Sequence, residues 1–386
     1  MPKPKLKKHK KEKEKTEEKG PERKKLTIQE QIKAFEREVS VTKYNKRTQH
    51  HIGLVKAKIA KLREKMLSGA KKKKGAGYSV RKTGDGTVIL LGFPSVGKST
   101  LLNALTKADS AVGSYNFTTL DVIPGLLDYN FAKIQILDVP GIVHGAANGT
   151  GRGREVLAVM RSADLAVIMV DVNKPEEFQA IMKEAHDSGI RLDQRKPDVK
   201  ISKKARGGIR IGATLKLKKI TKQTIESIMR EFGLINADIV IREDIDEDQL
   251  IDVIEANRHY IPSIVVINKI DTVKEEVLEK IISKIKPDLC ISATQLQYIE
   301  KLKQMIFDKL GLIRIYLKEI GKEPDLKEPL IMFKDCTVED VCNKLHRDFT
   351  KKFRFARIWG SSKFPGQKQM LKYKLKDKDI VEIHIS

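Results

Sequence analysis

The sequence of 386 residues predicts an α/β fold built on a doubly wound, mostly parallel sheet. Short apolar runs of strand length recur along the chain, and most of them end in a glycine-rich or polar motif. The first run leads through such a motif into the helix-like stretch 101–105. Binding residues of these folds gather where parallel strands end, so the motifs are the candidates for function. The apolar runs cover residues 88–91, 134–137, 165–170, 264–267 and 289–291.

The motif after the first run is GFPSVGKST, residues 92–100, which fits the pattern G-x-x-x-x-G-K-[ST]. Its glycines let backbone amides face phosphate oxygens, and the start of the following helix adds positive potential. Lys98 is expected to reach the β- and γ-phosphates, and the Ser99 hydroxyl to ligate Mg²⁺. A surface glycine loop is the alternative for this motif alone. The expected phosphate cradle consists of Gly92, Phe93, Pro94, Ser95, Val96, Gly97, Lys98, Ser99 and Thr100.

The second motif, DVPG at 138–141, ends another apolar run. A carboxylate at the carboxyl end of a parallel strand is typical of the Walker-B-type group that holds the Mg²⁺ shell, so Asp138 is assigned this role. The Gly141 amide can approach the γ-phosphate because no Cβ stands in the way.

Two further motifs indicate that the base is guanine. In Asn268-Lys269-Ile270-Asp271 the Asp271 carboxylate can accept from N1–H and the 2-amino group, which adenine lacks. The stem of Lys269 can cover one face of the base. A backbone amide to guanine O6 is expected from the last motif, which comprises Ser292, Ala293 and Thr294.

These motifs, in the wording GFPSVGKST…FTTL…DVPG…GRGRE…NKID, resemble the developmentally regulated GTP-binding protein family of the Obg GTPase superfamily. The resemblance covers the chain from about residue 26 to its end. It implies a P-loop GTPase with an N-terminal helical hairpin, a small α+β insertion and a C-terminal β-grasp domain called TGS. Thr119 matches the family's switch threonine, a second Mg²⁺ ligand beside Ser99. The expected catalytic residues are Lys98, Thr119 and Gly141, and the cofactors are GTP or GDP and Mg²⁺.

The predicted domains follow the chain in order. Residues 1–25 form a basic tail with too few apolar residues to order itself. Residues 26–79 form the helical hairpin and a linker, 80–175 and 247–310 the GTPase domain, 176–246 the insertion, and 311–386 the TGS domain. The hairpin is predicted from apolar residues at helical spacing: Ile28, Ile32, Phe35 and Val39, then Ile52, Val55, Ile59, Leu62 and Met66. The adjacent pair His50 and His51 cannot face one metal from a helix, so a surface or structural role is expected.

Charge points to a polyanionic partner. The net charge is +25, and residues 191–222 hold 12 Lys and Arg against two Asp. Residues 351–378 carry ten Lys and Arg against one Asp, with interspersed aromatics that are expected in the core. Ribosomal or transfer RNA is therefore the expected partner, through the insertion, the N-terminal region and the TGS domain. A regulatory protein is a further possible partner, no membrane is involved, and a monomer is expected.

The cysteines and the hydropathy of the chain indicate its cellular compartment. The three cysteines are scattered, which fits a reducing interior, and no apolar run approaches the roughly 20 residues that span a bilayer. The sequence predicts a cytoplasmic protein.

One position differs from the sequence pattern of GTPases with fast hydrolysis. A glutamine that orients the attacking water follows the DxxG glycine in those enzymes, and this chain has Ile142 there. The water must be held by switch backbone, by a partner, or by K⁺ near the phosphate loop, with Ser95 a conceivable K⁺ neighbour. His144 is read as a local substitution more readily than as a general base. Slow intrinsic hydrolysis is expected.

The function that fits best is GTP hydrolysis in a Mg²⁺-dependent switch on the ribosome or RNA, in translation or ribosome assembly. The alternative is an RNA-binding assembly factor in which GTP has mainly a structural role. Four intact residues argue against it: Lys98, Ser99, Asp138 and Thr119. A metabolic kinase or ATPase is disfavoured by Asn268 and Asp271.

Overall fold

A computed structural model describes residues 27–68, 84–106, 123–139 and 159–385. The predicted basic tail and most of the linker lie outside these residues. So do Thr119, Gly141, Ile142 and His144.

A six-stranded sheet forms the centre of the molecule, with strand order β11-β10-β4-β1-β3-β2. All neighbouring strands are parallel except β2 and β3, which form an antiparallel hairpin. This confirms the predicted doubly wound, mostly parallel sheet. The strands are β1 (Gly86–Leu91), β2 (Ile123–Tyr129), β3 (Ala132–Asp138), β4 (Leu165–Asp171), β10 (Ser263–Asn268) and β11 (Leu289–Cys290).

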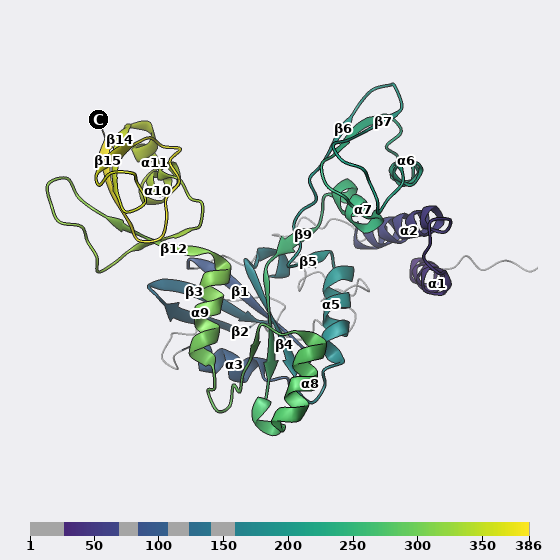
Figure 1. The fold of residues 1–386 in the computed structure, drawn as a ribbon, viewed down its shortest axis with the longest axis horizontal. Helices are drawn as coiled ribbons and strands as arrows, with labels where there is room; N and C mark the ends of the chain where they lie inside the picture. Colours follow the sequence, from purple (N-terminus) through teal and green to yellow (C-terminus); the bar gives the residue numbers. More distant parts are fainter. Residues whose placement is uncertain (1–26, 69–83, 107–122, 140–158, 386) are drawn as a thin grey trace, which may run out of the picture.

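Helices cover both faces of this sheet (Figure 1). On one face α3 (Lys98–Leu105) and α9 (Ile299–Leu310) pack against alternate strand residues such as Val88 and Leu90. On the other face α5 (Glu177–Asp187) packs against the intervening residues, such as Ile89 and Leu91. Because both faces are buried, the strands are continuous apolar runs, and β1 and β4 are fully buried. At the sheet edge α8 (Glu275–Ile285) packs through Ile281.

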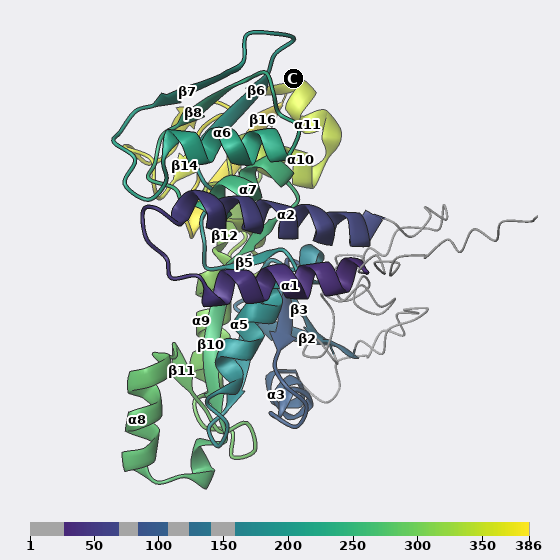
Figure 2. The same ribbon diagram turned by 90° about the vertical axis from the view of Figure 1, so that its right-hand side faces the viewer.

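The two N-terminal helices, α1 (Ile28–Val41) and α2 (Gln49–Ser68), lie side by side as predicted (Figure 2). Their predicted stripes meet in one cluster that contains Ile32, Val55 and Ile59. Thr27 begins α1 with a capping box to Glu30. His50 and His51 have separate partners, with His50 Nε2 2.8 Å from Ser227 Oγ and His51 Nε2 2.8 Å from Glu38 Oε1.

The insertion is a three-stranded sheet, ordered β6-β8-β7, with helices on one face. The second face of α2 packs on these helices, and Gly53 permits the close approach because a Cβ there would lie 3.0 Å from Thr224 Cγ2. The insertion elements are β6 (Val199–Lys203), β7 (Ile209–Ala213), α6 (Lys222–Glu231), β8 (Ala237–Ile241) and α7 (Glu247–Glu255).

The packing divides the chain differently from the predicted boundaries of 176–246. α5 and the short paired strands β5 (Ile190–Leu192) and β9 (His259–Ile261) belong to the core of the central sheet. α7 instead closes the core of the insertion through Leu250 and Ile251. Periodicity shows that a helix has an apolar stripe, but the neighbour that covers the stripe is decided by tertiary packing.

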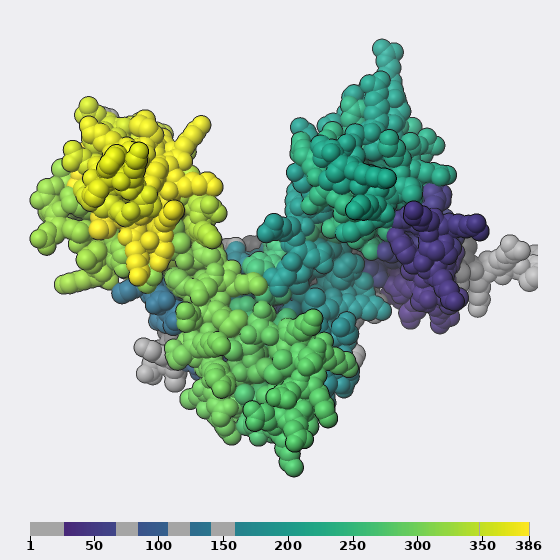
Figure 3. Space-filling model, viewed as in Figure 1, coloured from purple at the N-terminus to yellow at the C-terminus, as the bar shows by residue number. Residues whose placement is uncertain are grey.

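The C-terminal domain is a five-stranded sheet, ordered β13-β12-β16-β14-β15, in which β12 and β16 are parallel. In space-filling view it forms a lobe separate from the insertion (Figure 3). Ile331 of β13 and Leu312 of β12 join the central core, so the lobe is anchored to the GTPase domain. The strands are β12 (Leu312–Leu317), β13 (Leu330–Phe333), β14 (Phe353–Trp359), β15 (Gln367–Gln369) and β16 (Asp379–Ile385).

The helical segment after β13 is divided into α10 (Val338–Leu345) and α11 (Arg347–Lys351), because His346 has an extended backbone and its side chain caps α11. One expectation for this domain needs correction. The aromatics were expected in the core, and Phe353 and Tyr373 do pack there. Others do not: Phe355 stacks on His384 with ring centroids 4.3 Å apart, and Phe364 is 61% exposed.

Within the described residues, no helix is long and apolar enough to cross a membrane.

Removal of one buried charge tests the junction between insertion and GTPase domain. Asp252 of α7 accepts from Arg191 Nε (2.6 Å) and Arg258 Nε (2.7 Å), and its side chain is 4% exposed. Asp252→Ala leaves two guanidinium groups with no acceptor there, so we expect a loss of about 3 kcal/mol in apparent unfolding free energy. Urea denaturation followed by circular dichroism measures it. Asp198→Ala, at the exposed pair Asp198–Arg242, is the matched control and should cost below about 1 kcal/mol. Equal effects of the two variants would contradict the prediction.

Candidate functional site

The predicted motifs meet at one edge of the central sheet. The loop 92–97 follows β1, Asp138 ends β3, Asn268 ends β10, and Ser292 lies just after β11. Because these strands are parallel, their carboxyl ends lie at the same edge, where α/β folds bind ligands.

The phosphate loop has the backbone that its glycines permit. Gly97 has φ +97°, and a Cβ there would lie 2.5 Å from Asn268 Nδ2. Lys98 starts α3, and its ammonium donates to the carbonyl oxygens of Gly92 and Phe93, each at 3.1 Å. Burial lowers the pKa of Lys98, while the Asp138 carboxylate acts in the opposite sense. Lys98 is thus a buried cation held at the mouth of the loop.

Ser99 and Asp138 form a second feature of the site. Ser99 Oγ donates to Asp138 Oδ2 at 2.8 Å, although the two residues come from different elements. Asp138 Oδ1 is buried and has no hydrogen-bond partner among the described residues. A hydroxyl and a carboxylate with an unused oxygen are hard oxygen ligands of the kind that Mg²⁺ and its water shell prefer. These residues therefore fit the expected Mg²⁺ position.

Asn268 connects three segments of the site. Its Nδ2 donates to Val96 O in the phosphate loop at 2.8 Å, and its Oδ1 accepts from the Ala293 amide at 3.0 Å. Asp271 is exposed in the short 3₁₀ helix η2 (Ile270–Thr272), so its carboxylate is accessible for a base. The Ala293 amide is one of those expected to meet guanine O6, and here it is engaged by Asn268. Thr294, the next residue, is exposed.

Lys269 has a more elaborate environment than the sequence suggested. Its Nζ donates to Ser95 O at 2.8 Å and lies 2.7 Å from Asp171 Oδ2. Its backbone is left-handed, with φ +65°, which is unusual outside glycine. Thr272 Oγ1 donates to the Lys269 carbonyl at 2.8 Å and accepts from Asn173 Nδ2 at 3.1 Å.

Asp171, Asn173 and Thr272 were missed as site residues. Asp171 accepts from the amide and the side chain of Asn173 at 2.9 and 3.0 Å, so the three residues close a ring around Lys269. Burial raises the pKa of Asp171, but hydrogen bonds from Lys269 and Asn173 outweigh it and hold the pKa below its ordinary value. Asp171 ends β4 as Asp138 ends β3. Asp138 was selected because a carboxylate stands at the carboxyl end of a parallel strand, and the same rule could have selected Asp171.

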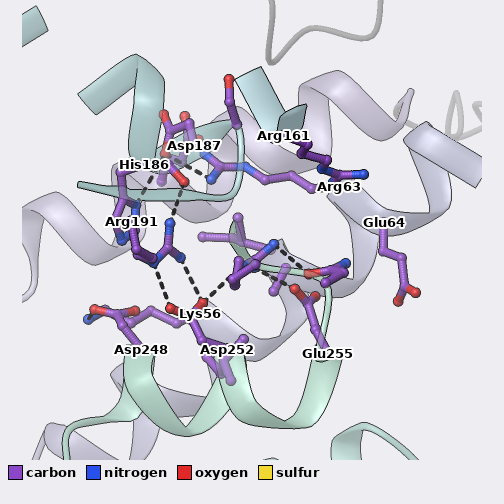
Figure 4. Close-up of a pocket in the computed structure, with 17 residues that line it drawn as sticks. Lys56, Arg63, Glu64, Arg161, His186, Asp187, Arg191, Asp248, Asp252 and Glu255 are labelled. Carbon is purple, nitrogen blue, oxygen red and sulfur yellow. Dashed lines mark hydrogen bonds and ion pairs between the residues drawn. The ribbon is translucent and has the colours of Figure 1, made fainter. Parts of the chain in front are cut away.

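A charged cavity lies elsewhere, where α2, α7 and the segment from α5 to β5 meet (Figure 4). Its volume is about 160 Å³. Ion pairs across it join the hairpin, the GTPase domain and the insertion to one another: Arg63–Asp187 (2.9 Å), Lys56–Asp248 (2.5 Å) and Arg191–Asp252 (2.6 Å). The cavity is a joint between three units, separate from the motifs of the sheet edge.

A phosphate loop, a serine–carboxylate pair and an Asn-Lys-x-Asp loop on a mostly parallel sheet define a P-loop GTPase. The family model described as a 50S ribosome-binding GTPase matches residues 87–203. The model for the C-terminal region of that domain matches 206–312, and the TGS domain model matches 313–385.

Curated proteins resemble nearly the whole chain. An uncharacterized GTP-binding protein of Methanocaldococcus jannaschii is 52% identical over 365 residues, covering 93% of each chain. Developmentally-regulated GTP-binding protein 2 of Homo sapiens is 40% identical over 362 residues, covering 93% of this chain and 99% of the relative. Developmentally-regulated G-protein 2 of Arabidopsis thaliana is 42% identical over 366 residues, covering 93% and 91%. The chain belongs to the family of developmentally regulated GTP-binding proteins, as its motifs predicted.

Asp171→Ala tests whether Asp171 positions Lys269. Without the carboxylate the Lys269 ammonium loses its charged partner, so we expect GDP affinity to fall about 10-fold, or about 1.4 kcal/mol. Fluorescent GDP titration measures the dissociation constant. Glu177→Ala removes the nearby ion pair with Lys174 and should leave the affinity unchanged. If Asp171 acts through Lys269, adding Asp171→Ala to the Lys269→Met variant should lower its GDP affinity only slightly. Additive losses of affinity in the double variant would refute this route.

The lowered pKa of Asp171 also sets a pH dependence. The pKa of Asp171 in the folded protein lies below its ordinary value of 3.8. Its ionised carboxylate therefore contributes its full stabilisation above pH 3.8, and this stabilisation is lost as the pH falls through the folded-state pKa. The ratio of GDP affinities between the wild type and Asp171→Asn should thus stay constant from pH 5 to pH 8. A ratio that changed steadily over that range would point to another titrating group.

Proposed function

We propose that the protein hydrolyses GTP to GDP and phosphate, and that it acts as a Mg²⁺-dependent switch on the ribosome or its RNA. The observation that carries the proposal is the hydrogen bond between Ser99 Oγ and Asp138 Oδ2, beside the unpartnered Asp138 Oδ1. The proposal is supported because Ser99, an expected Mg²⁺ ligand, is thereby joined to Asp138, the carboxylate expected to hold the Mg²⁺ shell.

The residues divide the work of phosphoryl transfer among themselves. Lys98 brings a fixed positive charge to the β- and γ-phosphates, where negative charge develops in the reaction. The loop amides and the start of α3 hold the same phosphates. Bound Mg²⁺ would further neutralise the phosphate charge; Ser99 and Thr119 would ligate it, and Asp138 would hold its shell.

Guanine selection belongs to the other end of the site. Asp271 would accept from the two guanine donors, and the stem of Lys269 would cover the base while its ammonium stays on Asp171 and Ser95 O. Since Asn268 and Lys269 both touch the phosphate loop, base recognition and phosphate binding depend on one connected framework.

The ribosome or its RNA as partner is inferred from charge. The net charge is +25, and cations are dense in the insertion and the C-terminal domain. Such a surface fits a polyanion. The matched family model is described as a ribosome-binding GTPase, which supports the same choice. Translation and ribosome assembly are the processes that supply such a partner.

Slow unassisted hydrolysis follows from the aliphatic Ile142 in place of a water-orienting glutamine. A partner or K⁺ would then complete the site. A regulated switch gains from this, because hydrolysis starts only when the completing group arrives.

The test is GTP hydrolysis by the full chain, with and without ribosomes, in K⁺ and in Na⁺. We expect stimulation by ribosomes of at least about 10-fold, and a further increase in K⁺ if that ion replaces the glutamine. Lys98→Ala should abolish the stimulated rate because phosphate charge is no longer neutralised.

No stimulation in either salt, together with tight GTP binding, would overturn the switch. It would favour an RNA-binding assembly factor in which GTP has mainly a structural role.

A further inference from the structure

The sheet of the insertion has one apolar face and one polar face. Alternate residues on all three strands, among them Ile201, Ile211 and Ile239, face α6 and α7 in the insertion core. The intervening residues form the outer face, defined as Lys200, Ser202, Arg210, Gly212, Asp238 and Val240. Asp238 is half-buried and the other five are exposed, so no described element covers this face.

Strand register places the outer face in two rows. Lys200, Val240 and Gly212 are opposite one another, and Ser202, Asp238 and Arg210 form the next row. β8 is the central strand, so Lys200 and Arg210 stand in successive rows on the two flanking strands, which lie about 10 Å apart at the usual strand spacing. The middle of the face carries small or short side chains, and none of the six is aromatic.

The cations of this face are not neutralised within the protein. The acid on it, Asp238, forms an ion pair with Lys204. Lys200 and Arg210 form no ion pair with any described residue. The same holds, within the described chain, for three exposed cations on the strand end and the adjoining loops: Lys203, Arg206 and Lys216. The outer face is therefore uncovered and positive.

We propose that the outer face of the insertion sheet binds the phosphate backbone of double-stranded RNA. The inference rests on the proposed function, since it names the RNA structure that the switch would recognise. Single-stranded RNA is held largely by stacking on aromatic side chains, which this face lacks. Duplex RNA is recognised by its shape and by phosphate and 2′-hydroxyl contacts across a wide, shallow minor groove. A smooth centre with cations on both sides suits that contact.

The C-terminal domain offers a contrast. Its cations are interspersed with aromatics, but Phe355 lies between His384 and Lys368, with Lys368 Nζ 4.6 Å from the ring centroid. Trp359 lies against Gly366, and Lys318 Nζ is 5.0 Å from its centroid. Because these rings are already in contact on their faces, the domain is a weaker candidate for base stacking.

The test uses the full chain and an RNA hairpin with about 16 base pairs, the length that a duplex-binding domain spans. Lys200→Glu with Arg210→Glu should weaken binding at least 10-fold. The slope of log affinity against log salt should become smaller by about 2, one for each lost phosphate contact. Both side chains are exposed, so the melting temperature should not change.

The matched control is Lys183→Glu with Lys284→Glu, two exposed lysines on α5 and α8 that change the net charge equally. It should leave the salt slope unchanged, and the basic N-terminal residues are common to all three proteins. A single-stranded RNA of the same length should bind the wild type more weakly than the hairpin.

Equal weakening by the two double variants would overturn the proposal, since only overall charge would matter. Wild-type preference for single strands would overturn it as well. Ribosome-stimulated GTP hydrolysis, measured in parallel, distinguishes failure of this RNA-binding proposal from failure of the proposed function. If ribosomes stimulate hydrolysis but the chain does not bind the RNA hairpin, the assignment of this face to duplex RNA is wrong and the proposed function is unaffected.

Discussion

The arrangement of the nucleotide site depends on the side chain of Asn268. It is 2% exposed and uses both ends of its amide, one on the Val96 carbonyl and one on the Ala293 amide. Lys269, the next residue, contacts Ser95 O. Two adjacent residues of the base-recognition motif thus hold the phosphate loop at two successive carbonyls. The loops expected to contact base and phosphate are therefore linked by direct hydrogen bonds, although the bonded residues are 172 and 174 positions apart in sequence.

This framework explains why an unusual backbone is tolerated there. Ser95 and Lys269 both have positive φ, at +65° each, a conformation that costs free energy in residues with a Cβ. The Lys269 ammonium bonds the Ser95 carbonyl, and Asp171 with Thr272 fixes Lys269 from the other side. Ser95 and Lys269 both lie at the edge of the sheet where the ligand is expected, beyond the ends of the buried strands β1 and β10.

Some acidic residues form ion pairs where the structural units meet. Asp252 is buried between two arginines, and Asp187 pairs with Arg63 where three structural units meet. The hairpin is held on one side by the insertion and on the other by α5, so a displacement of the insertion would carry the hairpin with it. The hairpin, the GTPase domain and the basic insertion are in this way joined to one another by ion pairs.

The sequence alone determined the central fold and the motifs that meet at the expected nucleotide site. Its strands are buried on both faces and therefore stand out as apolar runs, and the motifs follow them directly. The five-stranded C-terminal sheet was only partly foreseen, because short strands such as β15 leave little pattern. Asp171 was within reach of the same rule, since it too ends a buried strand.

Other features were decided by tertiary structure. Which core α5 and α7 join depends on neighbours far away in sequence, and an amphipathic helix does not specify its neighbour. The ring around Lys269 joins residues almost 100 positions apart, which no local pattern encodes. The strand register shows that Lys200 and Arg210 lie on the face of the insertion sheet opposite its core, which the sequence alone did not show. Sequence specifies residue types and periods, whereas proximity between distant segments arises from packing of the folded chain.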